Sequence, residues 1–198
     1  MILRKTSINC FMVIFLLIVG LQPVACSQND TGDPTEVKDF TLKDYEGNEH
    51  SLSDYKNSKA IVVIFVATEC PVSNAYNSRM EALYDDYKGK GIAYLGINSN
   101  KAEDVMDMKE HAKENGLTFP ILKDEKNIIA DQFKASVTPE VYILNSDLKV
   151  IYQGRIDNSR DEEDVESKDL RNALDEILSG KQVSKSTTKA FGCTIKRV

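Results

Sequence analysis

The sequence predicts an α/β protein with a mixed central β-sheet and helices on both faces of that sheet. Ile61–Thr68 and Ile92–Asn98 are continuous apolar runs rich in β-branched residues, which is typical of strands buried on both faces. A helical pattern lies between them, so they are expected to be neighbouring parallel strands joined by a right-handed crossover. Val141–Asn145 and Lys149–Tyr152 flank a turn and predict an antiparallel hairpin at the edge of the same sheet. Many functions share this architecture, so the fold alone decides little.

The remaining elements follow from local patterns. Apolar and polar residues alternate around the turn Glu46–Asn48, which predicts an N-terminal hairpin. Helical spacing of apolar residues predicts helices within 74–91, 101–116, 127–133 and 167–180, with glycine stops at Gly89 and Gly180. In the second of these, Val105, Met108 and Ala112 are expected to face inward. A short extended segment is expected at 118–122, because the residue before Pro120 disfavours the helical region.

Residues 1–25 have the pattern of an export leader. Arg4 and Lys5 precede an uncharged apolar run, Cys10–Leu21, which is short for a membrane-spanning helix. Small residues before Cys26 resemble a bacterial lipobox, although Pro23 departs from that motif. We expect Cys26 to be acylated, which would make the protein an exported bacterial membrane lipoprotein facing the periplasm or the cell surface. Ordinary secretion or an uncleaved anchor are the alternatives.

The polar residues 26–36 are then a flexible tether, and residues 37–198 form one domain with a C-terminal extension from about residue 181. The net charge of the whole chain is −6, and loss of the leader would remove two positive charges. An acidic chain without a basic cluster argues against nucleic-acid binding and against membrane contact other than through a lipid anchor. Two histidines, His50 and His111, lie far apart in the sequence, and no phosphate-binding loop is present, so neither a metal nor another cofactor is expected.

Two of the four cysteines remain for the domain, Cys70 and Cys193. Cys70 follows a buried strand and precedes Pro71, a residue suited to the first position of a helix. A thiol at that junction lies near free backbone amides, which stabilise a nucleophilic thiolate. The alternative is a structural cysteine buried as a small apolar residue. Ser73 stands where a Cys-x-x-Cys motif would have its second thiol, which excludes two-thiol exchange at the helix mouth.

Several motifs together resemble one family. They are "DFTLKDYEGNEHSL", "ECPVSNAYNSR", "GINSN", "LTFPILKD", "VTPEVYILN", "YQGRID" and "FGCTIK". Over Val37–Lys196 the chain resembles the thioredoxin-fold redoxins of the alkyl hydroperoxide reductase/thiol-specific antioxidant group, and more narrowly a peroxiredoxin-like branch with a single cysteine in CPxxN and a C-terminal GCxIK. The resemblance implies a thioredoxin-like sandwich in which Cys70 is a redox-active nucleophile. It also implies that Thr138 and Pro139 form a loop whose cis proline packs beside that cysteine. The implied reaction partners are a peroxide or a protein thiol or disulfide, with an external thiol as reductant.

The active loop departs from the peroxiredoxin pattern at Ala67, where that family usually has threonine or serine. Cys193 is hypothesised to dock near Cys70 and to act as a resolving thiol, with a permanent structural disulfide or an unpaired tail residue as alternatives. Arg79 is expected to pair with a carboxylate, and Glu140 to flank Cys70, where it would relay protons or disfavour the thiolate. A competing class is a thioredoxin-fold binding or scaffold lipoprotein without redox turnover.

Overall fold

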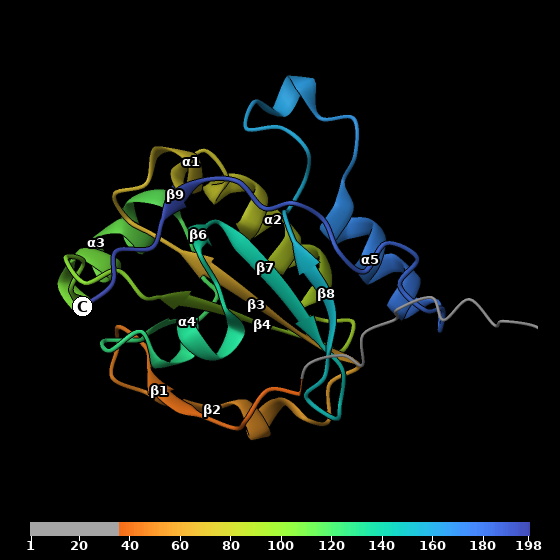
Figure 1. The fold of residues 1–198 in the computed structure, drawn as a ribbon, viewed down its shortest axis with the longest axis horizontal. Helices are drawn as coiled ribbons and strands as arrows, with labels where there is room; N and C mark the ends of the chain where they lie inside the picture. Colours follow the sequence, from red (N-terminus) through yellow and green to blue (C-terminus); the bar gives the residue numbers. More distant parts are fainter. Residues whose placement is uncertain (1–35) are drawn as a thin grey trace, which may run out of the picture. The chain divides into compact units, whose positions relative to one another are not determined.

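The computed structural model describes residues 36–198, so the expected leader, Cys26 and the tether up to residue 35 lie outside the described part. A five-stranded sheet in the order β5-β4-β3-β7-β8 forms the centre of this part (Figure 1). β3 (Ala60–Val66) is parallel to β4 (Ile92–Asn98), and β4 is parallel to β5 (Ile121–Lys123). On the other side of β3, β7 (Glu140–Leu144) and β8 (Val150–Gly154) form the antiparallel hairpin. The predicted parallel pair and edge hairpin are confirmed.

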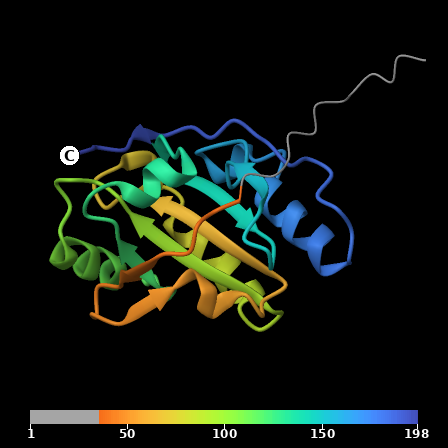
Figure 2. The ribbon, with the colours of Figure 1, turned by 60° about the horizontal axis from the view of Figure 1, so that its bottom comes forward.

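The side chains of β3 alternate between two apolar cores, one on each face of the sheet. Ala60, Val62, Ile64 and Val66 face one core, and Ile61, Val63 and Phe65 face the other. The first core is covered by α2 (Asn77–Tyr87), α3 (Val105–Asn115) and α5 (Asp169–Leu178). The second core is covered by η1 (Leu52–Tyr55) and α4 (Ile128–Phe133). The prediction of helices on both faces is therefore confirmed (Figures 1 and 2).

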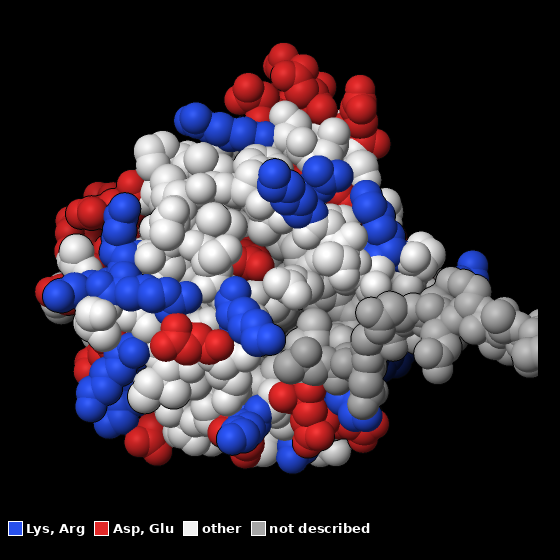
Figure 3. Space-filling view, in the orientation of Figure 1, with Lys and Arg blue, Asp and Glu red and all other residues white. Residues whose placement is uncertain are grey.

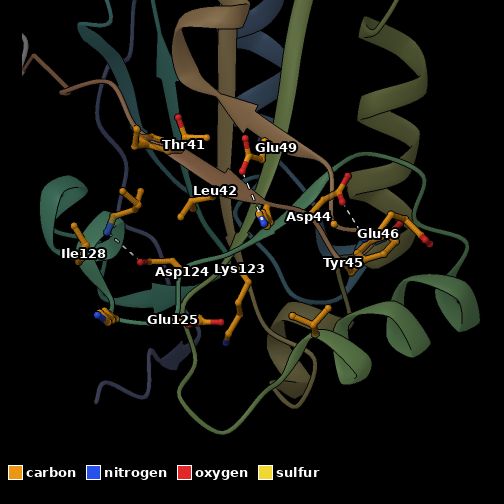
Figure 4. A pocket seen from close by; sticks show the side chains of 16 residues that line it. Thr41, Leu42, Asp44, Tyr45, Glu46, Glu49, Lys123, Asp124, Glu125 and Ile128 are labelled. Atoms are coloured by element: carbon orange, nitrogen blue, oxygen red, sulfur yellow. Dashed lines mark hydrogen bonds and ion pairs between the residues drawn. The ribbon is translucent and has the colours of Figure 1, made fainter.

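The expected N-terminal hairpin is present as β1 (Thr41–Lys43) and β2 (Glu49–Ser51), which pair antiparallel outside the main sheet. It borders an open groove of about 790 Å³ that reaches to the start of α4 (Figure 4). Leu42 and Ile128 both line this groove.

One expectation about α3 is wrong. Met108 and Ala112 are buried as predicted, but Val105 is 37% exposed and lines the open groove. Val105 is the first residue of the helix, directly after the N-cap Asp104, whose carboxylate accepts the N–H groups of Met106 and Asp107. This cap fixes the first turn of α3 beside the open groove, so Val105 lies outside the core.

The helix predicted to begin at Asn74 is interrupted. The structure has α1 (Pro71–Asn74), a turn at Ala75–Tyr76 and then α2. Within residues 36–198, no helix is both long enough and apolar enough to span a bilayer.

Beyond α5 the chain forms an extended tail, residues 181–198, drawn in dark blue in Figure 1. The tail pairs with the edge strand β8 through an isolated bridge between Gln153 and Thr187. It then forms the two-residue strand β9 (Cys193–Thr194), which pairs antiparallel with β6 (Val137–Thr138). The tail therefore passes over the end of the sheet at which β3 finishes. The exposed acidic residues of η2 (Glu162–Asp164) lie on a separate loop, visible as a red cluster at the top of Figure 3.

Candidate functional site

Cys70 lies four residues beyond the end of β3 and is the N-cap of α1. The Ser73 N–H donates to the Cys70 Sγ at 3.3 Å, and the carbonyl oxygen of Thr138 lies 3.3 Å from the same sulfur. Cys70 is only 4% exposed. α1 has four residues, so the local polar environment of the sulfur comes from individual amides and carbonyls rather than from a long helix.

A disulfide joins Cys70 to Cys193, which lies 123 residues further along the chain. The two Cα atoms are 5.8 Å apart, within the usual range for such a bridge. The predicted docking of Cys193 near Cys70 is therefore present in the structure. Its role as a resolving thiol stays a prediction.

The cis-proline loop completes this group. The peptide bond between Thr138 and Pro139 is cis, and Thr138 is the direct partner of Cys193 in the pairing of β6 with β9. The structure thus brings together the four residues expected to form the redox site: Cys70, Thr138, Pro139 and Cys193.

The tail is fixed on both sides of Cys193. Before it, the ring of Phe191 packs edge-on against Tyr76, with ring centroids 6.3 Å apart. After it, Ile195 is 3% exposed and its N–H donates to the Ser136 carbonyl oxygen at 3.0 Å. Cys193 is therefore presented to Cys70 by an anchored segment rather than by a free end.

The Glu140 side chain supports the proline loop. Its carboxylate is buried and accepts the Ser136 N–H at 2.8 Å and the Tyr142 hydroxyl at 2.9 Å. Burial, followed by the negative charge of Glu140, raises the pKa of Tyr142 well above its ordinary value. Tyr142 therefore remains a hydrogen-bond donor, and the Glu140 carboxylate is engaged in holding the turn that leads into Thr138.

The expectation that Arg79 pairs with a carboxylate is confirmed. Its guanidinium donates to Asp157 at 2.6 Å and lies over the ring of Tyr76, 3.7 Å from the centroid. The Tyr76 hydroxyl donates to the other Asp157 oxygen at 2.8 Å. Burial and this hydrogen bond raise the pKa of Tyr76. The cluster attaches the loop after β8 to the N-terminal turn of α2.

The two histidines have local structural contacts. His50 lies between Asp44 and Tyr55, at 2.9 and 2.7 Å, and His111 contacts the Asn77 side chain at 3.1 Å. Across residues 36–198, no three His, Cys, Asp or Glu side chains are grouped so as to hold a metal ion. The absence of a cofactor stays a prediction.

One residue near the site carries no signal in the sequence. Glu103, in the loop between β4 and α3, is buried and accepts the backbone N–H groups of Thr68 and Glu69. These are the two residues directly before Cys70. An isolated glutamate after a strand does not stand out, and the contact spans 35 residues of chain, so sequence reasoning missed it.

A family model described as the AhpC/TSA family matches residues 34–153, which include Cys70 and the cis-proline loop. The chain belongs to the AhpC/TSA family. The narrower branch defined by CPxxN and GCxIK is not distinguished by this match. Among curated relatives, the thiol-disulfide oxidoreductase ResA of Geobacillus kaustophilus is 30% identical over 65% of this chain and 74% of its own length. A probable phospholipid hydroperoxide glutathione peroxidase of Arabidopsis thaliana is 35% identical over 36% of this chain and 30% of its own length.

Solved structures give the same fold. A hypothetical protein from Sinorhizobium meliloti has a TM-score of 0.79 at 32% identity, covering 84% of this chain and 94% of its own. The thioredoxin domain of a thiol-disulfide oxidoreductase from Bacteroides vulgatus has a TM-score of 0.59 at 17% identity, covering 73% of this chain and 97% of its own. The thioredoxin-like fold is therefore confirmed. The family and its relatives also bear out the expected enzyme class, a thiol oxidoreductase or peroxidase.

Proposed function

We propose that this redoxin is a thiol-dependent oxidoreductase in which Cys70 is the attacking nucleophile and Cys193 the resolving thiol. The observation that carries the proposal is the bond between these two sulfurs beside the Thr138–Pro139 loop. A thiol at the N-cap of α1, within reach of the Ser73 N–H, is favourably placed to react as a thiolate. The 5.8 Å distance between the Cα atoms of Cys70 and Cys193, which lie 123 residues apart in the sequence, supports a resolving role for Cys193.

With a peroxide as substrate, the Cys70 thiolate attacks one peroxide oxygen and the O–O bond breaks. The departing oxygen takes up a proton and leaves as an alcohol or water, and Cys70 becomes a sulfenic acid. The Cys193 thiol then attacks the Cys70 sulfur. The S–S bond forms, and the sulfenic hydroxyl leaves as water with the proton of Cys193. An external dithiol restores both thiols and is itself oxidised by two electrons to a disulfide.

With a protein disulfide as substrate, the Cys70 thiolate attacks one substrate sulfur and forms a mixed disulfide. Cys193 then attacks Cys70 and releases the substrate as a dithiol, so the same Cys70–Cys193 bond results. The ResA relatives support this second substrate class by their name, and the glutathione peroxidase relatives support the first. Ala67 at the place of the usual hydroxyl residue weakens the case for a specialised peroxidase.

The decisive experiment measures the reactivity of Cys70 in the Cys193→Ser variant, where it has no partner within the domain. We expect Cys70 to be alkylated at neutral pH faster than a free cysteine peptide and to be oxidised by hydrogen peroxide or by a small disulfide. Slow alkylation together with inertness to both oxidants would favour the competing interpretation, a scaffold protein with an incidental thiol.

For location, we propose export and acylation at Cys26, with residues 1–25 removed and the following residues acting as a tether. The support is the short apolar run before Cys26 and the small residues that precede it. Cells expressing the protein should incorporate a fatty-acid probe into the wild type and not into Cys26→Ala. Equal labelling of both, or a mature N-terminus elsewhere, would refute the assignment.

A further inference from the structure

The buried carboxylate of Glu103 links the segment before Cys70 to the interior. Glu103 is 4% exposed. One of its oxygens accepts the Thr68 N–H at 2.7 Å and the Asn98 side-chain amide at 2.5 Å, and the other accepts the Glu69 N–H at 3.4 Å. Three donors thus converge on one side chain. A carboxylate suits this place because both of its oxygens only accept hydrogen bonds.

The turn that leads to Cys70 is also held from its other side. The Asn74 side-chain amide donates to the Thr68 carbonyl oxygen at 2.8 Å. Both backbone groups of Thr68 are therefore used, its N–H by Glu103 and its C=O by Asn74. Since Cys70 lies two residues beyond Thr68, these contacts fix the position of Cys70 beside the cis-proline loop.

The loop that carries Glu103 also receives the tail that carries Cys193. The Lys196 N–H donates to the Asn100 side-chain oxygen at 2.8 Å, and the Lys101 N–H donates to the Lys196 carbonyl at 2.8 Å. Lys123, the last residue of β5, also fixes this loop, because its ammonium donates to the carbonyl oxygens of Asn100 and Glu103 at 2.7 and 2.5 Å. We call residues 99–103 the brace loop.

We infer that Glu103 is a positioning residue for the thiol pair and that the brace loop holds the two cysteine-bearing segments in register. This inference rests on the proposed function, in which Cys70 and Cys193 react with each other. Glu103 acts through the Thr68 and Glu69 backbones. A fixed arrangement of two thiols raises the effective concentration of one at the other, which sets how readily the disulfide forms.

The test is the redox equilibrium of the intact domain with reduced and oxidised dithiothreitol, which yields the effective concentration of Cys193 at Cys70. In Glu103→Gln, an amide NH₂ would face backbone and amide donors, so the turn before Cys70 must shift. We expect the effective concentration to fall about tenfold, while the far-UV circular dichroism stays that of the wild type. Glu103→Asp keeps the carboxylate but shortens its reach, and we expect an intermediate value. Glu114→Gln, an exposed glutamate on α3, is the matched control and should leave the equilibrium unchanged.

A folded Glu103→Gln variant with the wild-type equilibrium would overturn the inference. If Glu103→Gln does not fold, Glu103→Asp decides, because its equilibrium must then lie measurably below that of the wild type. Failure of the proposed function would look different. The wild-type disulfide would still reach equilibrium with dithiothreitol and still respond to Glu103, because an equilibrium does not depend on the rate of exchange, but Cys70 would be alkylated slowly and would not be oxidised by hydrogen peroxide.

Discussion

At the scale of single residues, the buried ion pair between Arg79 and Asp157 connects α2 to the loop after β8. The two side chains are 11% and 5% exposed, and their charged atoms are 2.6 Å apart. Removal of one member leaves the other charge buried without its partner. Arg79→Ala should therefore lower the free energy of unfolding by about 3 kcal/mol, measured by urea denaturation.

The exposed pair between Asp85, in the last turn of α2, and Lys88, its C-cap, is the control for that prediction. Its side chains are 49% and 56% exposed, so Lys88→Ala should change the free energy of unfolding by less than about 1 kcal/mol. If Arg79→Ala and Lys88→Ala lowered the free energy of unfolding by similar amounts, the stability of the fold would not depend on the buried pair more than on the exposed one.

The buried contacts of Asp169 predict that the free energy of unfolding depends on pH. Burial on its own would raise the pKa of Asp169, but hydrogen bonds from Lys185, Arg155 and Ser167 outweigh it and bring the pKa below its ordinary value of 3.8. A lowered pKa in the folded state means that the unfolded chain takes up the proton more readily. The stabilisation by Asp169 is thus complete above pH 3.8 and is lost as the pH falls toward the folded-state pKa.

The corresponding measurement compares the free energy of unfolding of the wild type and of Asp169→Asn between pH 7 and pH 3. The wild type should be more stable at pH 7, and the difference should shrink on acidification below about pH 4. Asp147→Asn, in the exposed turn between β7 and β8, should show no such convergence. A gap that stays constant over this pH range would show that the contacts of Asp169 do not depend on its charge.

At the scale of elements, the two-residue strands β6 and β9 decide where Cys193 lies. Gly192, directly before β9, has a φ of +156°, and a Cβ added to it would clash with the Thr138 carbonyl oxygen. Gly192→Ala should therefore displace β9 from β6. We expect the Cys70–Cys193 disulfide to close about tenfold more slowly or slower still. The closure rate is measured by adding an oxidant and alkylating the thiols that remain free at successive times.

Gly89→Ala is the control for this substitution, because an added Cβ there meets no atom within 4 Å. Its closure rate should equal that of the wild type. Wild-type closure in Gly192→Ala would indicate that the tail reaches Cys70 without the pairing of β6 and β9.

The same elements show how far the sequence predicts this structure. The apolar runs in β3 and β4 were recognisable because each is long and buried on both faces, so every position carries the signal. β6 and β9 have two residues each, and a two-residue strand has no periodicity to detect. Val105 satisfies the helical spacing but follows the N-cap directly, where the helix has not yet reached the core.

The sequence predicts the reactive residues of the candidate site, but not the contacts that hold them in position. Cys70 and Pro71 mark a strand-to-helix junction by their types and order, and Cys193 was the only other cysteine left for the domain. Glu103 and Asn100, in contrast, act on segments 35 and 96 residues away. Asn100 belongs to the motif "GINSN", but its contact with the tail arises only in the folded chain, and no local pattern distinguishes Glu103 from other polar loop residues.

At the scale of the whole molecule, the disulfide connects the centre of the sheet to the end of the chain. The tail leaves α5, runs along β8, pairs with β6, contacts the brace loop through Lys196 and ends beside Asn127 at the start of α4 (Figures 1 and 2). Cys70 is thereby covered by the segment that carries its partner thiol. A redox cycle through this pair requires that oxidation of Cys70 be followed by closure within the same chain.

The most direct test of this account is peptide mapping of the reduced domain after treatment with an excess of hydrogen peroxide, with the Cys193→Ser variant treated in parallel. The wild type should yield a linked Cys70–Cys193 peptide and little further oxidation of Cys70. The variant should accumulate Cys70 as sulfinic acid or as mixed disulfides, because no second thiol of the domain intercepts the sulfenic acid. Equal overoxidation of Cys70 in both proteins, without a linked peptide, would contradict the resolving role of Cys193.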